Sequence, residues 1–296
     1  MPYVFTIALE NEARSDIYGS SDAPYLNDTL MAQYGHATNY QEVLPLGIES
    51  GPHYVWMEAG TNALADHSFT TDDDPSRSNS SSSTAHLVSQ LQNAGVSWRV
   101  YMEDIDGSSG ACPLYSNGHF AAWHNPVIWF QDVVGSPPSA SNAYCVAHHR
   151  NYGQRFTDDL NSGDVAHYTF ITPNLCHDMH GASGCPNSNG VNAGDTWLSQ
   201  NLPPIIDFVN AHGGVIFIIW DETSATNQWG DPVMPFLTVG PDIKSGYAST
   251  VEESHSSYLK TVEELLGVPV LPNVQGANDL SSYWKPGRFP ASASQQ

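Results

Sequence analysis

The sequence predicts an α/β fold in which helices cover both faces of a mostly parallel sheet. Residues 213–222 carry the main evidence, because six consecutive apolar residues follow a glycine pair and precede Asp221 and Glu222. This run is too short to span a membrane and too uniformly apolar for a half-exposed strand, so we interpret it as an interior strand. Strand-like and helix-like segments also alternate along most of the chain, a pattern typical of parallel sheets.

The N-terminal third of the chain supplies the first elements. A β-rich apolar segment at 4–9 ends in the polar residues Glu10 and Asn11. Residues 72–84 are too polar to pack and are expected to form a loop. Thr84 is placed to cap the helix that follows this loop, and Gly95 to end it. The remaining elements predicted here are helices at 24–34, 54–59 and 85–93 and a strand at 97–102.

The regular alternation fails between about 106 and 164, where aromatic residues, prolines, histidines and two cysteines dominate. We interpret this stretch as a long insertion over the carboxyl edge of the sheet. Neither a repeat nor a domain boundary is evident, so residues 1–296 are expected to form a single domain. The elements predicted after the insertion are strands at 167–172, 213–220 and 236–239 and helices from Asp195 towards Ala211 and at 255–266, followed by an irregular tail beyond Pro269.

The charge balance excludes several classes of partner. Only 9 Lys and Arg stand against 31 Asp and Glu, a formal net charge of -22. Such a surface repels nucleic acids and anionic membranes, so we expect no nucleic-acid partner and no stable membrane association. A phosphate-type substrate would need metal ions here rather than a cluster of arginines.

The four cysteines indicate an exported protein. Cys176 and Cys185 flank a short polar loop, and Cys112 and Cys145 flank a longer one, so we expect one disulfide in each pair. No C-x-x-C pair occurs, which disfavours a zinc knuckle. Scarce lysine and no signal peptide at Met1 favour a mature secreted or periplasmic form.

Polar side chains follow three of the predicted strands. Glu10 and Asn11 follow the first strand and Asp221 and Glu222 follow the strand at 213–220, which together form a first group. Asp178 and His180 follow the strand at 167–172 and form a second group with His255, which begins the final helix. Because the carboxyl ends of parallel strands meet at one edge of a sheet, we expect these groups to converge. This arrangement is typical of one- or two-metal hydrolases.

The ligand types do not identify a single metal ion. The four oxygen ligands of the first group suit Ca²⁺, Mg²⁺ or Mn²⁺, whereas the second group would also accept zinc or iron. Each residue also has a structural alternative, since Asn11 and Glu12 are typical helix caps and His255 fits the first turn of a helix.

Several segments match, in order along the chain, the motifs of one known family. The first is Ile7-Ala-Leu-Glu10-Asn11-Glu, which is similar to the family's opening motif. The others are Tyr54-Val-Trp-Met-Glu-Ala-Gly-Thr-Asn62, His124-Asn-Pro126, Thr172-Pro-Asn-Leu-Cys-His-Asp178-Met-His180, Gly194-Asp-Thr-Trp-Leu198, Trp220-Asp-Glu222 and His255-Ser-Ser-Tyr-Leu-Lys-Thr-Val-Glu-Glu264. Together they resemble the phosphoesterase family of bacterial acid phosphatases and phosphatidylcholine-type phospholipases C, within the alkaline phosphatase superfamily. The resemblance covers the chain from its first strand to about Gly267.

This resemblance implies an alkaline phosphatase-like α/β/α sandwich. It implies metal ligands at Glu10, Asn11, Asp221 and Glu222, with Asp178, His180 and His255 binding a second metal or the substrate. His124 resembles a family histidine close to the phosphate. Ser50 stands at the position of the family nucleophile, in the segment Ile48-Glu49-Ser50-Gly51-Pro52-His53-Tyr54. The family motif resembles His-Pro-Ser-Leu-Pro-Asn-Tyr, so this chain departs from it on both sides of the serine.

Ser50 has a chemical rationale in this place. A serine hydroxyl needs an activator, which metal coordination would provide. The mouth of a helix would add amide donors and a favourable dipole for an anion. His53 is positioned to bind phosphate or to act as the general acid for the leaving group. The alternative is that Ser50 is only an N-cap and His53 a surface residue.

Three functions are compatible with these residues. The first is a metal-dependent phosphomonoesterase with a phosphoseryl intermediate and a small phosphate ester as substrate. The second is a phospholipase C-like phosphodiesterase, for which the aromatic residues of the insertion, Trp123, Trp129, Phe130 and Tyr144, would supply an apolar rim. The third is a non-catalytic metal- or glycan-binding module on the same fold. A sulfatase is disfavoured because Tyr54 replaces the arginine of the sulfatase motif.

Overall fold

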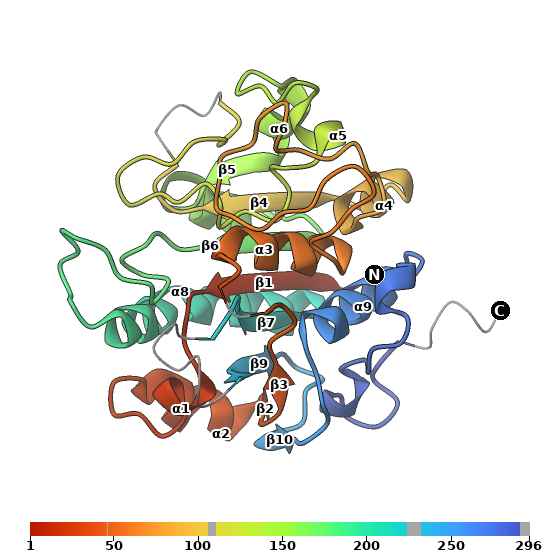
Figure 1. The fold of residues 1–296 in the computed structure, drawn as a ribbon. Helices are drawn as coiled ribbons and strands as arrows, with labels where there is room; N and C mark the ends of the chain where they lie inside the picture. The colour runs from red at the N-terminus through yellow and green to blue at the C-terminus, as the bar shows by residue number, and fades with distance from the viewer. Residues whose placement is uncertain (46, 106–110, 224–231, 291–296) are drawn as a thin grey trace.

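The fold is built around one eight-stranded sheet, with strand order β10-β2-β9-β7-β1-β6-β4-β5 (Figure 1). The computed structural model describes residues 1–45, 47–105, 111–223 and 232–290. The strands are β1 Tyr3–Leu9, β2 Gly35–Ala37, β4 Trp98–Met102, β5 His149–Asn151, β6 Tyr168–Thr172, β7 Gly214–Trp220, β9 Phe236–Val239 and β10 Tyr247–Ser249, with β3 Tyr40–Gln41 and β8 Val233–Met234 forming a separate pair.

The helices include two long ones, α8 Gly190–His212 and α9 His255–Leu266, and the ten-residue α3 Ser50–Ala59. The shorter ones are α1 Arg14–Ile17, α2 Met31–Gln33, α4 Leu87–Asn93, α5 Gln131–Val134, α6 Ala143–His148 and α7 Thr157–Ser162, with π-helical turns η1 Tyr25–Leu30 and η2 Tyr152–Phe156 and 3-10 turns η4 Pro272–Val274 and η5 Ser281–Tyr283.

Five adjacent strands, β7, β1, β6, β4 and β5, run parallel to one another. β9 is antiparallel to both of its neighbours, β7 and β2, and β10 is parallel to β2. The carboxyl ends of β1, β6 and β7 therefore lie side by side, with β1 in the middle. This placement brings the polar residues that follow the three strands to one edge of the sheet.

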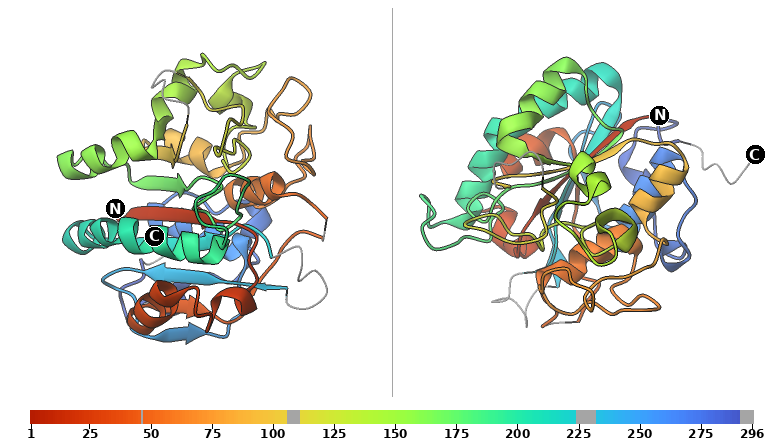
Figure 2. Two further views of the ribbon diagram at one scale, coloured as in Figure 1. Left: turned by 90° about the vertical axis from the view of Figure 1, so that its left-hand side faces the viewer. Right: turned by 90° about the horizontal axis from the view of Figure 1, so that it is seen from above.

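Alternate side chains of the strands pack into two separate cores. Val4 and Ala8 of β1 belong to the cluster that includes apolar residues of α3, α4 and α9. Phe5, Ile7 and Leu9 belong to the other cluster, which includes the apolar side of α8. Figure 2 shows these helices on opposite sides of the sheet. The predicted α/β/α sandwich with a mostly parallel sheet is confirmed, because a strand buried on both faces needs a helical layer on each.

Element boundaries differ from the sequence prediction at several points. α3 begins at Ser50 rather than at residue 54, and α8 begins at Gly190 rather than at Asp195. Residues 149–162, which the sequence assigns to the irregular insertion, contain β5, η2 and α7. β5 has only three residues, so its apolar pattern is too short to be recognised. β9 pairs antiparallel, which a short apolar run does not reveal.

Both predicted disulfides are present. Cys112 pairs with Cys145 and Cys176 pairs with Cys185, each with a Cα–Cα distance of 5.3 Å. Disulfides persist in oxidising compartments, so they favour a protein that works outside the cytosol. Among the described residues, no helix is both long and apolar enough to cross a membrane.

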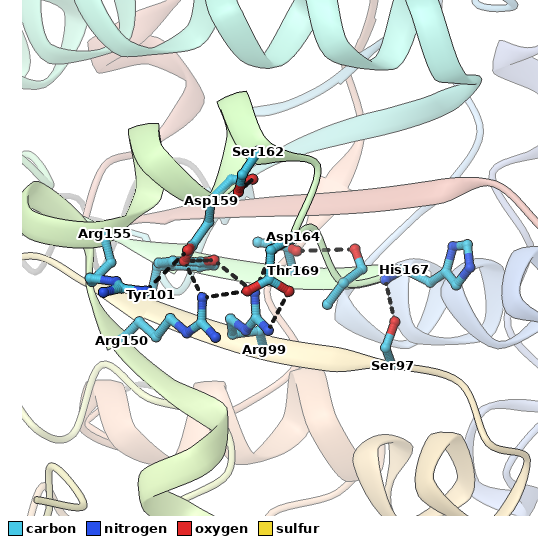
Figure 3. Close-up of polar contacts among 11 residues, drawn as sticks. Ser97, Arg99, Tyr101, Arg150, Arg155, Asp159, Ser162, Asp164, His167 and Thr169 are labelled. Atoms are coloured by element: carbon cyan, nitrogen blue, oxygen red, sulfur yellow. Dashed lines mark hydrogen bonds and ion pairs between the residues drawn. The ribbon is translucent and has the colours of Figure 1, made fainter. Parts of the chain in front are cut away.

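Three of the nine Lys and Arg residues meet at the β4–β5 side of the sheet (Figure 3). Arg150 pairs with Asp159 and, at 3.0 Å, with Asp164. Arg99 reaches Asp164 at 3.2 Å, and Arg155 lies 3.6 Å from Asp159. These scarce cations are thus paired with acids away from the edge where the polar strand ends converge.

Candidate functional site

Three strand ends and one helix start meet at the carboxyl edge of the sheet. The backbone N–H of Glu10 donates to the Asp178 carbonyl at 2.7 Å, and that of Asp221 donates to the Leu9 carbonyl at 3.1 Å. These two bonds join the loops that follow β1, β6 and β7. Ser50 begins α3 beside them and is 5% exposed. The predicted convergence of Glu10, Asp178 and Asp221 is therefore found in the structure.

Ser50 lies among carboxylates. Its Oγ is 3.2 Å from Glu10 Oε2 and 3.1 Å from Glu222 Oε1, both within hydrogen-bond reach. A hydroxyl has a single proton, so it donates to one of these oxygens at a time. The two acceptors, Glu10 and Glu222, come from the ends of β1 and β7. An N-cap serine would instead accept a hydrogen bond from its own helix. Glu49, not Ser50, is the N-cap residue of α3, and Ser50 is the first residue of the helix.

Glu10 is fully buried and held from two sides. The Tyr54 hydroxyl, one turn along α3 from Ser50, donates to Glu10 Oε1. His124 Nε2 lies 3.3 Å from Glu10 Oε2, while its Nδ1 lies 3.2 Å from Asp178 Oδ2. The His124 ring stacks on Tyr54 with a centroid distance of 5.5 Å. His124 therefore bridges two carboxylates, and Tyr54 fixes the ring and Glu10 together.

Asn11 adopts a left-handed backbone conformation, with φ of 50°. Asparagine tolerates this conformation better than most residues. Its backbone N–H donates to Asp221 Oδ1 at 3.1 Å, and its side-chain amide lies 3.2 Å from both Glu222 Oε1 and Asp221 Oδ1. The amide can either turn its NH₂ group to these oxygens or share a cation with them through its own oxygen.

Burial and neighbouring negative charges destabilise the ionised forms of these carboxylates. Burial, together with the charges of Asp221 and Asp178, raises the pKa of Glu10 well above its usual range. Burial and the neighbouring Glu222 do the same to the pKa of Asp221. The pKa of Glu222 rises to about 8, first through burial and then through Glu42. Burial and mutual repulsion therefore favour the protonated forms of these carboxyls unless positive charge lies nearby.

The residues present fit a divalent cation. Asp178 Oδ2 and Asp221 Oδ2 are buried acceptors without a hydrogen bond, which is costly unless a cation or a proton meets them. The Asn11 amide lies against two acceptors, as a ligating amide oxygen would. Carboxylate and amide oxygens are the ligands that hard divalent cations prefer. Glu10, Asn11, Asp221 and Glu222 form this oxygen-rich set, which we call the Glu10 cluster.

The second predicted ligand group is dispersed. His255 is fully buried, with Nε2 2.5 Å from the Asp221 carbonyl and Nδ1 3.1 Å from the Tyr40 hydroxyl. Both of its nitrogens are thus engaged, and it supports the loop that carries Asp221. His180 is exposed, and its Nδ1 contacts the Gly181 carbonyl at 2.8 Å. Its backbone N–H donates to Asp178 Oδ1 at 2.9 Å, so only the main chain of His180 supports Asp178 directly.

Several residues near the site escaped the sequence analysis. Glu42 follows β3 and lies 3.4 Å from His53, and Asp72, from the polar loop, accepts a 2.7 Å bond from the Gly51 N–H. Asp72 therefore occupies one amide donor at the start of α3, and Pro52 has none to offer. The expected anion-binding helix mouth is thus partly filled by a carboxylate. No residue spacing indicated Glu42 or Asp72, because each meets the site only through the tertiary fold.

Known proteins with related sequences are named as phosphatases. The model of the Phosphoesterase family matches residues 18–269. A phosphatidylinositol-3-phosphatase from Mycobacterium tuberculosis is 24% identical over 95% of this chain and 82% of its own length. A probable acid phosphatase from Kluyveromyces lactis is also 24% identical, over 92% of this chain and 60% of its own length.

Solved structures share the fold. A phosphonate monoester hydrolase from Silicibacter pomeroyi superposes with a TM-score of 0.58 at 10% identity, covering 100% of this chain and 78% of the hydrolase. A protein of the alkaline phosphatase superfamily from Vibrio parahaemolyticus superposes with a TM-score of 0.57 at 13% identity, covering 95% of this chain and 70% of that protein. At these identities the likeness concerns the fold alone.

Proposed function

Since this chain belongs to the phosphoesterase family, we propose that it is a metal-dependent phosphomonoesterase in which Ser50 is the nucleophile. The family and its phosphatase relatives make the chain a hydrolase of phosphate ester bonds. The observation that carries the finer proposal is the position of Ser50 Oγ, 3.2 Å from Glu10 Oε2 and 3.1 Å from Glu222 Oε1. Ser50 is not the N-cap residue of α3, which is Glu49.

The Glu10 cluster would hold the metal ion. When bound, a divalent cation there would neutralise the phosphate and increase the acidity of the serine hydroxyl. Its four oxygen ligands suit Ca²⁺, Mg²⁺ or Mn²⁺.

Ser50 and its two carboxylate neighbours would perform the first chemical step. Ser50 Oγ attacks phosphorus, and its proton passes to Glu10 Oε2 or Glu222 Oε1. The bond from phosphorus to the leaving alkoxide breaks as the Ser50–phosphorus bond forms, which gives a phosphoserine. Water then attacks phosphorus, releases inorganic phosphate and restores the serine.

The two histidines would have different roles. We place His124 at the phosphate, because it bridges Glu10 and Asp178 beside Ser50. His53 is fully buried, and burial, aided by His255, lowers its pKa to about 3. A neutral imidazole has no proton to give to a leaving group. We therefore give His53 no acid role in the proposed reaction.

Monoesters fit the site better than large lipid diesters. Trp129 and Phe130, two of the aromatic residues considered for an apolar rim, are at most 1% exposed and belong to the core. Trp123 is half-buried against His124, with ring centroids 5.7 Å apart. The surroundings of the described site thus offer little apolar surface for acyl chains. A phosphodiesterase remains the second candidate, because the same nucleophile and ligands would serve it.

The substitution Ser50→Ala tests the proposal. If Ser50 is the nucleophile, hydrolysis of 4-nitrophenyl phosphate should fall by several orders of magnitude. Metal content and melting temperature should change little, and the phosphorylated peptide trapped by acid quenching should disappear. The matched control is Ser89→Ala, which removes a buried hydroxyl from α4 away from the Glu10 cluster. Near-normal turnover by Ser50→Ala would show that water attacks directly. Comparison with bis-(4-nitrophenyl) phosphate would separate monoester from diester preference.

A further inference from the structure

The two carboxylate oxygens of Glu222 face different neighbours. Oε1 lies 3.1 Å from Ser50 Oγ, whereas Oε2 lies 3.9 Å from His53 Nε2. On the other side of the His53 ring, Nδ1 lies 3.4 Å from Glu42 Oε1. One potential ligand atom from each of Glu42, His53 and Glu222 lies within 4.8 Å of the other two. Glu222 thus belongs both to the Glu10 cluster and to this second group, which we call the His53 trio.

His53 lacks the partners that a buried imidazole needs. Its side chain is 1% exposed, and neither ring nitrogen makes a hydrogen bond. The backbone of Ile48 lies close enough to raise the pKa of His53, but neither ring nitrogen has a hydrogen bond to it. A neutral imidazole has one N–H and one lone pair. With a carboxylate near each nitrogen, the lone pair faces negative charge unless a proton or a cation lies between them.

Glu42 is oriented towards this gap. Its Oε2 accepts a 3.0 Å hydrogen bond from the Thr223 N–H, which leaves Oε1 on the His53 side. The Glu42 side chain is 9% exposed and that of Glu222 is 21% exposed, so the trio has limited access to solvent. Two carboxylates brought this close repel each other, and Glu42 contributes to the raised pKa of Glu222.

We propose that Glu42, His53 and Glu222 bind a second divalent cation, and that Glu222 bridges it to the cation of the Glu10 cluster. The shared role of Glu222 rests on the proposed function. An imidazole with two carboxylates favours Zn²⁺ or Mn²⁺ over Ca²⁺, which prefers oxygen alone. Three protein ligands leave a coordination position for water or a substrate oxygen, as catalytic zinc sites do.

The other histidine-containing group of this kind among the described residues is His119 with Cys176 and Cys185. Both of its sulfurs are used in a disulfide, so they cannot ligate as thiolates. The His53 trio has no such competing bond.

Cation stoichiometry tests the inference without relying on activity. The chelator-treated chain is titrated with Mn²⁺, and bound metal is measured by mass spectrometry after desalting. The wild-type chain should bind about two equivalents, and Glu42→Gln and His53→Leu about one each. Electron paramagnetic resonance should show a spin-coupled Mn²⁺ pair in the wild-type chain and isolated Mn²⁺ in both variants. Circular dichroism checks that each variant is folded.

Matched controls lie elsewhere in the fold. Glu252→Gln removes an exposed carboxylate, and His36→Leu removes a half-buried imidazole from β2. Both controls should keep the wild-type stoichiometry and the coupled spectrum. Loss of the second equivalent in the controls as well would overturn the assignment to the trio.

Failure of this inference is distinguishable from failure of the proposed function. One equivalent in the wild-type chain, unchanged in Glu42→Gln, would overturn the second site while Ser50-dependent turnover could stand. Two equivalents that persist in both trio variants would overturn it equally. If the wild-type chain binds no cation, the second site and the metal dependence of the proposed function both fall.

Discussion

His86 ties the helix that begins at Ser50 to two other helices, and this link should make stability depend on pH. His86 is fully buried at the start of α4, with Nδ1 2.8 Å from Glu58 Oε1 on α3. Its Nε2 lies 3.1 Å from both oxygens of Asp132 on α5, and the ring stacks on Phe130 at 3.9 Å. An imidazolium that donates from both nitrogens satisfies both acids.

The magnitude follows from the pKa of His86. Burial alone would lower it, but the hydrogen bonds to Asp132 and Glu58 outweigh burial and raise the pKa to about 9. Relative to an unfolded value of about 6.5, this difference corresponds to about 3 kcal/mol of unfolding free energy. The folded state binds the proton more tightly, so this contribution is complete below about pH 6.5 and is lost as the pH rises through about 9. Burial also raises the pKa of Glu58.

Urea unfolding of the wild-type chain and of His86→Gln, measured from pH 6 to pH 9.5, tests this reasoning. The difference in unfolding free energy between the two should shrink by about 3 kcal/mol across the window. The control is His36→Gln, because burial lowers the pKa of His36 and its titration therefore lies below the window. Chelator in every sample removes the contribution of bound metal. A difference that stays constant with pH would refute the proposed charge on His86.

Three further outcomes are expected. Exhaustive chelation should abolish turnover and lower the melting temperature, because a cation bound only by the native state is linked to folding; full activity in metal-depleted buffer would contradict this. Replacing Cys176 and Cys185 by serine should reduce turnover more than melting temperature, since the two cysteines, nine positions apart, enclose Asp178. The same substitutions at the other disulfide are the comparison, and a loss confined to stability would count against this prediction. Asp72→Asn should lower KM for an anionic substrate roughly two- to fivefold, because it removes a negative charge at the start of α3 while an amide oxygen can still accept from the Gly51 N–H. Asp73→Asn is the matched exposed control. An unchanged KM in Asp72→Asn would contradict the repulsion between Asp72 and the substrate.

The sequence alone was sufficient to predict features that depend on local pattern. The run at 215–220 had to be buried on both faces, so its position in the interior of the sheet followed, and its parallel pairing with β1 brings Glu10 and Asp221 together. The disulfide pairs followed from loop closure. The strand prediction needs only the apolar run and the direction of parallel strands, and the disulfide prediction needs only the spacing of the cysteines.

Features that depend on long-range packing were not predictable in this way. Glu42 lies in an irregular segment after the two-residue β3, and only the fold brings it to His53. Asp72 came from a loop judged too polar to pack, yet its Oδ1 reaches the Gly51 N–H. His255 had the right residue type for a ligand, but Tyr40 and the Asp221 carbonyl engage its nitrogens. Residue types indicate which ligands are available at the carboxyl edge of the sheet. Tertiary contacts determine which of their atoms are not already engaged in hydrogen bonds.

The charge distribution gives the proposed metal dependence a physical reason. The ion pairs of Glu10, Glu42, Asp178 and Glu222 among the described residues involve only His53 and His124. Three of the arginines, Arg99, Arg150 and Arg155, are paired with Asp159 and Asp164 at the β4–β5 side of the sheet. Asp72 takes an amide at the start of α3 that would otherwise attract an anion. A phosphate dianion brought to Ser50 would therefore lie against the carboxyl groups of Glu10 and Glu222. Divalent cations held by these same groups would supply the positive charge that such a substrate needs.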